Sequence, residues 1–298
     1  MSARIAPPPA PSAASAAALV LATGAALAAS GAGLPLAGAT ATLAACAAIL
    51  LFGLPHGALD LRLLTQRAPV ARLALYLGLA AAMLALWRAA PIAALVVFLI
   101  MAVIHFAEDW AALEEPFLAL GTAAGLLAAP GLLHMETLHG LFTALTGEAG
   151  AAVLGDVLRL GAPVGLMLAL VAVLALLRRG QTALGVATGA ALAGLVLLPP
   201  AIGFALYFAL LHSPQHLAAE LPEGTAARRR IWSRVILPMT GLSLLIAAGL
   251  ALIETRPTPG DTAVVATFMA LSILTTPHML APRLIGWLEA PRGLKSPA

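Results

Sequence analysis

Long apolar runs recur along almost the whole of this sequence and leave no stretch long enough for a separate soluble domain. Only 10% of the 298 residues are charged, 61% are hydrophobic, and the mean hydropathy is +1.00. A bilayer core about 30 Å thick is crossed by roughly 20 apolar helical residues, which is the length of these runs. The sequence therefore predicts an all-α fold, a polytopic transmembrane helix bundle.

The apolar runs predict about ten membrane helices in a single domain over residues 14–288. We expect these helices over residues 14–34, 36–55, 73–89, 91–107, 117–133, 161–178, 182–198, 201–217, 235–253 and 262–281. The first run is long for a cleaved signal peptide, so we interpret it as a retained helix. Residues 1–13 are expected to be disordered, residues 289–298 to form a short tail, and the polar stretch from 134 to 156 to lie along the membrane interface.

Basic residues are distributed unevenly between the two predicted sides of the membrane. With a cytoplasmic N-terminus, thirteen of the 16 Lys and Arg residues fall inside, and three fall outside: Arg88, Arg159 and Arg256. This asymmetry predicts a multi-pass protein of the cell (inner) membrane with cytoplasmic N- and C-termini. Cytoplasmic loops also explain the pI near 9.7, so no nucleic acid partner is expected. His134 and His139 fall outside and are expected to be ordinary interfacial residues.

Five histidines fall at the predicted cytoplasmic ends of the helices. His212 and His216 are four residues apart, which puts both on one face of a helix. His56, His105 and His278 lie at the same depth in other helices. Polar groups at membrane depth are costly unless they are paired or functional, and imidazole is a common ligand of iron, copper and zinc. The histidines therefore predict a metal site; for His278, hydrogen bonding between helices is an equal alternative.

Acidic residues follow two of these histidines closely. Asp60 comes four residues after His56, and Asp109 comes four residues after His105. On a continuous helix each carboxylate would lie near its histidine. Ligating imidazoles usually donate their other N–H to such a group, so Asp60 and Asp109 are expected to orient the ligands, with solvated loop charges as the alternative. Glu108 is expected to be a solvated loop charge.

Four motifs in this order on an apolar chain resemble a known family. They are GLPHGALDLRLL at 53–64, HFAEDW at 105–110, LLHSPQHL at 210–217 and TTPHML at 275–280. Together they look like the Brp/Blh family of membrane β-carotene 15,15′-dioxygenases, over residues 50 to 285. The resemblance implies that O2 cleaves the central double bond of β-carotene to give two all-trans-retinal molecules, which supply microbial rhodopsins.

The resemblance also implies a set of site residues. Those that match the positions expected to bind Fe(2+) are His56, His105, His212 and His216. His278 matches a recurrent family histidine and is a possible additional ligand or catalytic group. Four imidazoles around an octahedral ion leave up to two positions for O2 and the alkene, and only one if His278 also binds. Gln215 departs from the family, where a basic residue is expected more often, which bears on substrate preference.

A substrate of this kind is a long hydrocarbon that partitions into the lipid bilayer. Entry between helices from the side would avoid transfer through water. Aromatic side chains are expected to line such a tunnel, with core packing or lipid contact as equal alternatives: Phe52, Phe106, Phe204, Tyr207, Phe208 and Phe268.

Three other functions remain open at this point. A membrane metal-dependent hydroxylase or desaturase of a lipid or carotenoid also uses HxxxH boxes, but two irons need more ligands than five histidines unless the acids bind too. A divalent-metal transporter would place its polar residues near the bilayer midplane. A non-catalytic rhodopsin-assembly factor would not depend on the histidines. No GxxxxGK[ST] motif or GxGxxG motif in a βαβ setting supports a nucleotide-binding function.

Overall fold

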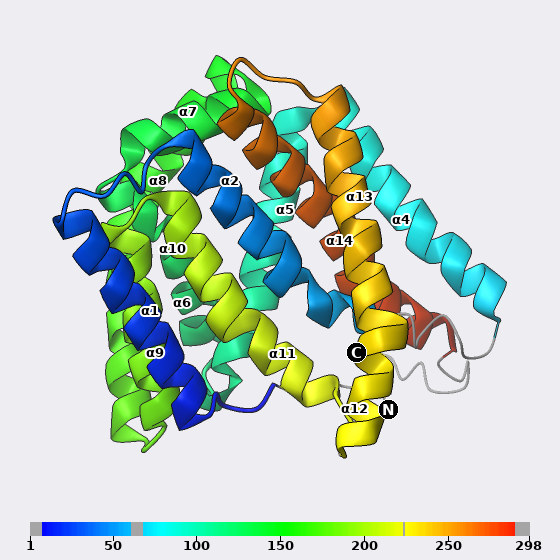
Figure 1. Cartoon of the computed structure of the whole chain (residues 1–298), viewed down its shortest axis with the longest axis horizontal. Coiled ribbons are helices and arrows are strands. Elements are labelled where there is room, and N and C mark those ends of the chain that lie inside the picture. The colour runs from blue at the N-terminus through cyan, green and yellow to red at the C-terminus, as the bar shows by residue number, and fades with distance from the viewer. Residues whose placement is uncertain (1–7, 61–67, 223, 290–298) are drawn as a thin grey trace, which may run out of the picture.

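The computed structural model describes residues 8–60, 68–222 and 224–289, and the elements in these ranges are helices (Figure 1). The α-helices are α1 (Ala13–Gly31), α2 (Ala39–Ala48), α4 (Pro69–Ala89), α5 (Pro91–Phe106), α6 (Pro116–Ala128), α7 (Met135–Thr146), α8 (Glu148–Arg178), α9 (Thr182–Leu197), α10 (Pro200–Tyr207), α11 (Ser213–Glu220), α12 (Thr225–Ile231), α13 (Leu237–Ile253) and α14 (Pro259–Glu289). The π segments are η1 (Ile49–Gly53), η5 (Phe208–His212) and η6 (Trp232–Ile236), and the 3-10 segments are η2 (Leu54–Asp60), η3 (Ala107–Leu113) and η4 (Ala129–Leu132). The predicted all-α fold class is confirmed.

Within the described residues, seven helices are long and apolar enough to cross a membrane. An eighth span results if one bent pair is counted as a single crossing. This pair consists of Pro116–Leu132 and Met135–Thr146, whose axes meet at 107°. α9 is apolar but has only 16 residues. The predicted number of about ten spans is therefore not confirmed, although the apolar runs are helical.

The polar stretch before residue 156 is helical as well. α7 occupies its first part, and α8 then begins at Glu148 and continues for 31 residues. The helix that the sequence predicts over 161–178 is therefore much longer at its N-terminal end. Asp156 and Arg159 form an exposed ion pair of 3.3 Å on this helix. Because both side chains lie on the outer surface, their charge does not interrupt the helix.

α14 lies in the middle of the bundle, with α2, α4, α5 and α13 packed around it (Figure 1). In its most apolar 18-residue window 61% of the residues are buried, against 17% for α1 and α4 at the two edges. The outer helices turn apolar side chains away from the bundle, including Leu160 (79% exposed) and Leu252 (81% exposed). An apolar surface of this extent indicates a membrane protein.

Ion pairs at the two ends of the bundle join residues that the charge pattern assigns to the same side. Arg72 at the start of α4 pairs with Glu289 at the end of α14, at 2.6 Å. At the opposite end, Glu254 pairs with Arg88 and, at 3.4 Å, with Arg256. The arrangement of these helices thus agrees with the two sides predicted from the basic residues.

Two glycines let α6 and α8 approach each other closely. A Cβ atom on Gly165 would lie 2.6 Å from the Cα of Gly125, and a Cβ on Gly125 would lie 2.2 Å from the carbonyl oxygen of Gly165. Small residues allow this kind of backbone contact between membrane helices. A side chain at either position would push the two backbones apart.

We expect Gly165→Ala to separate α6 from α8 and to lower the free energy of unfolding by about 1–3 kcal/mol, the usual cost of overpacking. Gly161→Ala is the matched control on the same helix, because a Cβ there meets nothing within 4 Å. Thermal unfolding of the purified proteins in detergent, followed by circular dichroism, measures the difference. Equal stability of the two variants would contradict the close contact of these helices.

Candidate metal centre

Several departures from regular α-helix geometry meet at one end of the bundle. α5 tightens into the 3-10 segment η3, and the π segment η5 separates α10 from α11. After α2 the chain continues as the π segment η1 and the 3-10 segment η2, and η1 packs against η5. π segments within α-helices frequently occur at functional sites. Here these irregular segments carry or flank the histidines.

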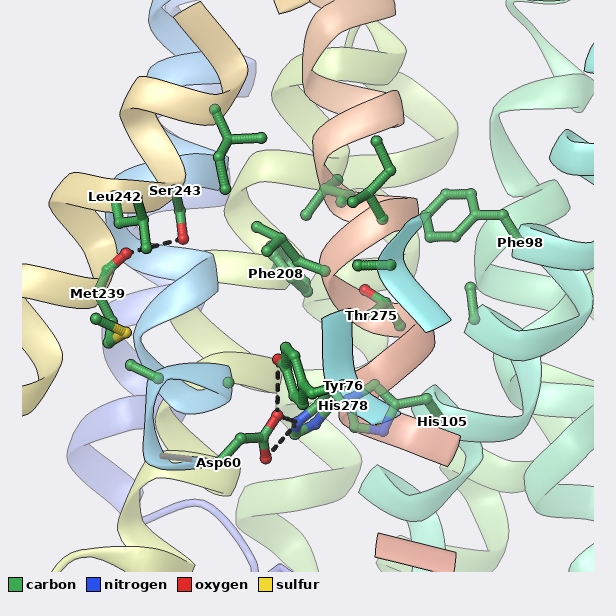
Figure 2. Close-up of a pocket in the computed structure, with 18 of the residues that line it drawn as sticks. Asp60, Tyr76, Phe98, His105, Phe208, Met239, Leu242, Ser243, Thr275 and His278 are labelled. Atoms are coloured by element: carbon green, nitrogen blue, oxygen red, sulfur yellow. Dashed lines mark hydrogen bonds and ion pairs between the residues drawn. The ribbon is translucent and has the colours of Figure 1, made fainter. Parts of the chain in front are cut away.

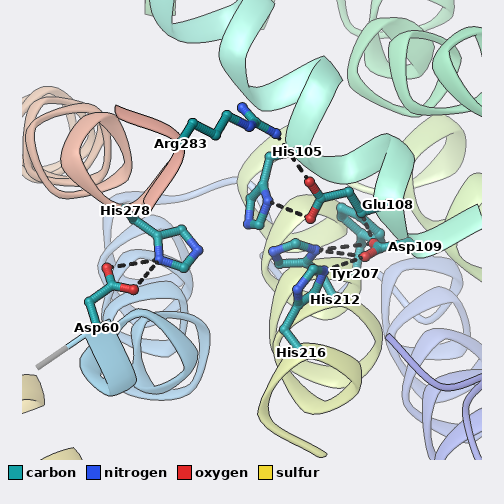
Figure 3. Close-up of polar contacts among 9 residues, drawn as sticks. All are labelled: Asp60, His105, Glu108, Asp109, Tyr207, His212, His216, His278 and Arg283. Carbon is teal, nitrogen blue, oxygen red and sulfur yellow. Dashed lines mark hydrogen bonds and ion pairs between the residues drawn. The ribbon is translucent and has the colours of Figure 1, made fainter. Parts of the chain in front are cut away.

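Three histidines from these elements form one cluster, which we call the histidine cluster. His105 lies at the end of α5, His212 at the end of η5, and His216 in α11. Their ring centroids are 4.5, 4.8 and 4.9 Å apart, and one nitrogen of each ring lies within 4.8 Å of the others. The rings point toward one another in Figure 3. The structure thus brings together three of the four predicted metal ligands.

Asp109 is the carboxylate behind two of these rings (Figure 3). It is fully buried and accepts hydrogen bonds from Nδ1 of His212 (3.0 Å), Nε2 of His216 (2.9 Å) and the hydroxyl of Tyr207 (2.8 Å). The sequence spacing instead placed Asp109 near His105. That expectation assumed a continuous α-helix, whereas Asp109 lies in the 3-10 segment η3. Residues four apart do not share a face in such a segment, so Asp109 faces α10 and α11.

Glu108 occupies the position beside His105. Its Oε2 lies 3.4 Å from Nδ1 of His105, and its Oε1 lies 3.5 Å from the guanidinium of Arg283 on α14. Residues three apart share a face in both α and 3-10 geometry, so Glu108 can face His105 across the junction of α5 and η3. The expectation of a solvated loop charge is therefore corrected. Glu108 connects a clustered histidine to α14.

His278 lies beside the histidine cluster with a carboxylate of its own. Its ring centroid is 5.2 Å from that of His105, and its Nδ1 is 2.9 Å from Asp60. Asp60 also accepts a hydrogen bond of 3.2 Å from the hydroxyl of Tyr76 on α4 (Figure 2). The sequence spacing placed Asp60 near His56, but both lie in the 3-10 segment η2. In the structure Asp60 therefore supports a histidine of a distant helix.

His56 lies in η2, but its side chain is outside the described part of the structure. The adjacent Gly57 lies close to His278, since a Cβ on Gly57 would be 3.9 Å from Nδ1 of that ring. η2 also packs against α11. The backbone that carries His56 thus passes beside the cluster.

His139 lies away from the cluster. It pairs with Glu148 at 2.9 Å near the start of α8, as expected for a residue at the other end of the bundle.

An apolar cavity, which we call the lateral cavity, reaches the histidines from one side of the bundle (Figure 2). His105 and His278 lie at one end of it, and its empty volume is about 1220 Å³ including its mouth. α4, α5, α13 and α14 supply most of its wall. Two wall residues, Leu77 of α4 and Leu242 of α13, are 58% and 49% exposed. The cavity therefore opens on the apolar outer surface of the bundle.

The six aromatic residues predicted to line a tunnel lie in different places. The lateral cavity is lined by three of them: Phe106, Phe204 and Phe208. Phe268 lines a second cavity in the middle of the bundle. Phe52 is 62% exposed, and Tyr207 is buried against Asp109. That Phe106, Phe204, Phe208 and Phe268 line a substrate tunnel stays a prediction.

Comparison with known proteins identifies the family. The family model described as beta-carotene 15,15′-dioxygenase matches residues 47–289. The chain belongs to this family. A beta-carotene 15,15′-dioxygenase from the uncultured marine bacterium 66A03 is 28% identical over 257 residues, covering 79% of this chain and 90% of that protein. No solved structure matches the chain. Because the chain belongs to this family, it is an enzyme of the dioxygenase class.

The histidine cluster of this dioxygenase fits a metal ion. Its ring nitrogens are close enough to share one ion, and a carboxylate stands behind each ring. Ligating imidazoles usually make such contacts with their other nitrogen.

The hydrogen bond from Tyr76 to Asp60 was not predicted from the sequence. Its signal in the sequence is a phenol within an apolar span, where a hydroxyl needs a hydrogen-bond partner.

Gly53 lets the ring of Phe208 approach the backbone beside the histidine cluster. A Cβ on Gly53 would lie 2.0 Å from Cε1 of Phe208. Phe208 in turn stacks on His212, with ring centroids 5.2 Å apart and an interplanar angle of 10°. A side chain at position 53 would therefore force Phe208 to move and disturb the position of His212.

We expect Gly53→Ala to lower dioxygenase turnover by about tenfold or more, because misplacing a catalytic group by about 1 Å can cost up to 100-fold. Gly78→Ala on α4 is the control, since a Cβ there meets nothing within 4 Å. Product formation per mole of purified protein measures the effect. Wild-type turnover in the Gly53 variant would show that Phe208 does not constrain the centre.

Proposed function

We propose that this chain uses one Fe(2+) ion and O2 to cleave the central 15,15′ double bond of β-carotene into two all-trans-retinal molecules. The observation that carries the proposal is a buried histidine cluster beside an apolar cavity that opens on the lipid-facing surface. The names of the family and of the marine relative support the substrate and the reaction. The reaction balances without an external reductant, because one O2 supplies one oxygen atom to each carbon of the broken C=C bond.

The proposed iron ligands are the clustered His105, His212 and His216, with His56 as the fourth. Motif resemblance supports His56, and so does the backbone of η2 beside the cluster. Bound iron would supply the redox chemistry that activates O2 toward a closed-shell alkene. His278 lines the lateral cavity and is held by Asp60, so we assign it a position facing the substrate. Neutral imidazoles suit this buried centre because they add no further negative charge.

The residues around the centre position ligands and exclude water. Asp109 restricts the rotation of His212 and His216, and Tyr207 holds the second oxygen of that carboxylate. The hydrocarbon substrate passes from the bilayer into an apolar cavity without crossing water, which avoids the cost of hydrating it. Exposed Leu77 and Leu242 at the cavity wall are suited to contact both lipid and substrate.

We propose that the end of the bundle with the histidines faces the cytoplasm in the inner membrane. The distribution of basic residues supports this orientation. Both ends of the described chain lie at this end of the bundle: the carbonyl of Pro9 accepts a hydrogen bond of 3.4 Å from Gln215, and Glu289 pairs with Arg72. Retinal released into the bilayer would be available to a membrane protein such as a microbial rhodopsin.

The alternative functions have less support. Among the described residues, one group of three or more metal-ligating side chains is close enough to hold an ion, whereas a di-iron hydroxylase or desaturase needs ligands for two. A transporter would place its polar site near the midplane. Here the cluster lies at the end of the bundle, next to the partly exposed ion pair of Glu108 and Arg283.

Expression in a carotenoid-producing bacterium tests the proposed reaction. We expect retinal and loss of carotenoid with the wild type, and only background retinal with His212→Ala or His216→Ala, because each removes a proposed ligand. His139→Ala is the control, since this exposed residue pairs with Glu148 away from the cluster. Chromatography measures both pigments at equal membrane abundance. Intact carotenoid with a folded, iron-loaded wild type would refute the proposed reaction.

Asp109→Asn tests the role of the buried carboxylate. The amide keeps the size of the side chain but removes its charge and one acceptor, so we expect the iron affinity to fall by about 10–100-fold. Competition with a chelator under anaerobic conditions measures this affinity directly. Asp156→Asn on the outer surface of α8 is the matched control. Equal iron retention by both variants would mean that Asp109 does not orient the ligands.

A further inference from the structure

A second cavity, which we call the central cavity, lies in the middle of the bundle and has no part in the function proposed above. α2, α5, α7, α10 and α14 supply most of its wall. The wall is largely apolar and includes Cys46, Leu99 and Phe268. Its far end lies at Thr258 and Asp261, where α14 begins. The cavity therefore extends from the level of the histidines toward the opposite end of the bundle.

The lateral and central cavities share part of their walls beside the metal centre. The shared residues are Phe98, Ala102, Phe106, Phe204 and Leu271. Ala102 lies about one helical turn before His105 on α5 and has the smallest side chain of the five. Phe98 packs edge to face on Phe268, with ring centroids 6.2 Å apart. Few side chains therefore separate the two cavities next to the histidines.

Cleavage of a central bond requires apolar space for the substrate on both sides of the histidines, and the lateral cavity provides it on one side. When the middle of a rod-like polyene lies at the histidines, half of the molecule extends to either side. His105 and His278 lie at one end of the lateral cavity (Figure 2), so this cavity takes one half. The other half needs a second apolar space that adjoins the centre.

We propose that the central cavity binds this second half, so that the carotenoid passes beside Ala102 into the middle of the bundle. This inference rests on the proposed function and adds the site that sets which bond is cleaved. The apolar wall is suited to a hydrocarbon, and the edge-to-face pair of Phe98 and Phe268 lies along the path. The distance that the polyene enters the central cavity determines which double bond stands at the histidine cluster.

Leu99→Trp tests this proposal because Leu99 lines the central cavity but not the lateral one. Ile100→Trp is the matched control: the adjacent side chain is 56% exposed and lines neither cavity. Purified proteins loaded with Fe(2+) are assayed with β-carotene and with β-apo-8′-carotenal, in which one half is truncated. We expect Leu99→Trp to lower β-carotene cleavage about tenfold and apocarotenal cleavage less than about threefold, while the control changes neither.

Anaerobic binding of β-carotene, followed by the absorbance of the bound pigment, gives a readout that needs no turnover. Weaker binding by Leu99→Trp than by Ile100→Trp supports the proposal. Equal losses with both substrates, or no loss with either, overturn it. If the Trp variant does not yield folded protein, Leu99→Phe replaces it because it adds less volume. This variant must also lower β-carotene cleavage more than apocarotenal cleavage. Absence of cleavage of either substrate by the wild type refutes the proposed function itself.

Discussion

The buried carboxylate of Asp109 is the group on which the arrangement of the histidine cluster depends. Moving a carboxylate out of water costs several kcal/mol unless its oxygens are well bonded. Here His212, His216 and Tyr207 provide the donors. Asp109 follows α5, whereas its three partners lie on the helical stretch of α10, η5 and α11. The same bonds that orient two imidazoles therefore also hold two distant parts of the chain together.

The irregular helical segments make this arrangement possible. In a regular α-helix both Glu108 and Asp109 would lie on the same face as His105. With the 3-10 geometry of η3, Glu108 contacts His105, whereas Asp109 contacts the histidines of η5 and α11. Adjacent acids thus contact different histidines of the cluster. In the same way, η2 turns Asp60 toward His278, where Tyr76 completes its hydrogen bonding.

The sequence predicts the helices and the clustering of the histidines better than their partners. Apolar length determines where helices form, and the four-residue spacing of His212 and His216 holds because the regular helix α11 begins directly after His212. The partners of Asp60 and Asp109 could not be predicted, because the spacing rule fails in 3-10 segments. The number of spans depends on bends such as the 107° break before α7. The central cavity depends on packing between segments far apart in the sequence, which local patterns do not contain.

The fold places the histidine cluster at one end of a largely apolar bundle. One cavity reaches His105 from the outer surface, and the central cavity shares part of its wall with that cavity. Everything proposed for the reaction requires that one iron ion is bound at the histidine cluster. The most direct test is the metal content of anaerobically purified protein, with X-ray absorption to identify the ligands. We expect one iron per chain with mostly nitrogen ligands, lost in His105→Ala. Two irons per chain, or full iron occupancy in that variant, would contradict a mononuclear centre held by these histidines.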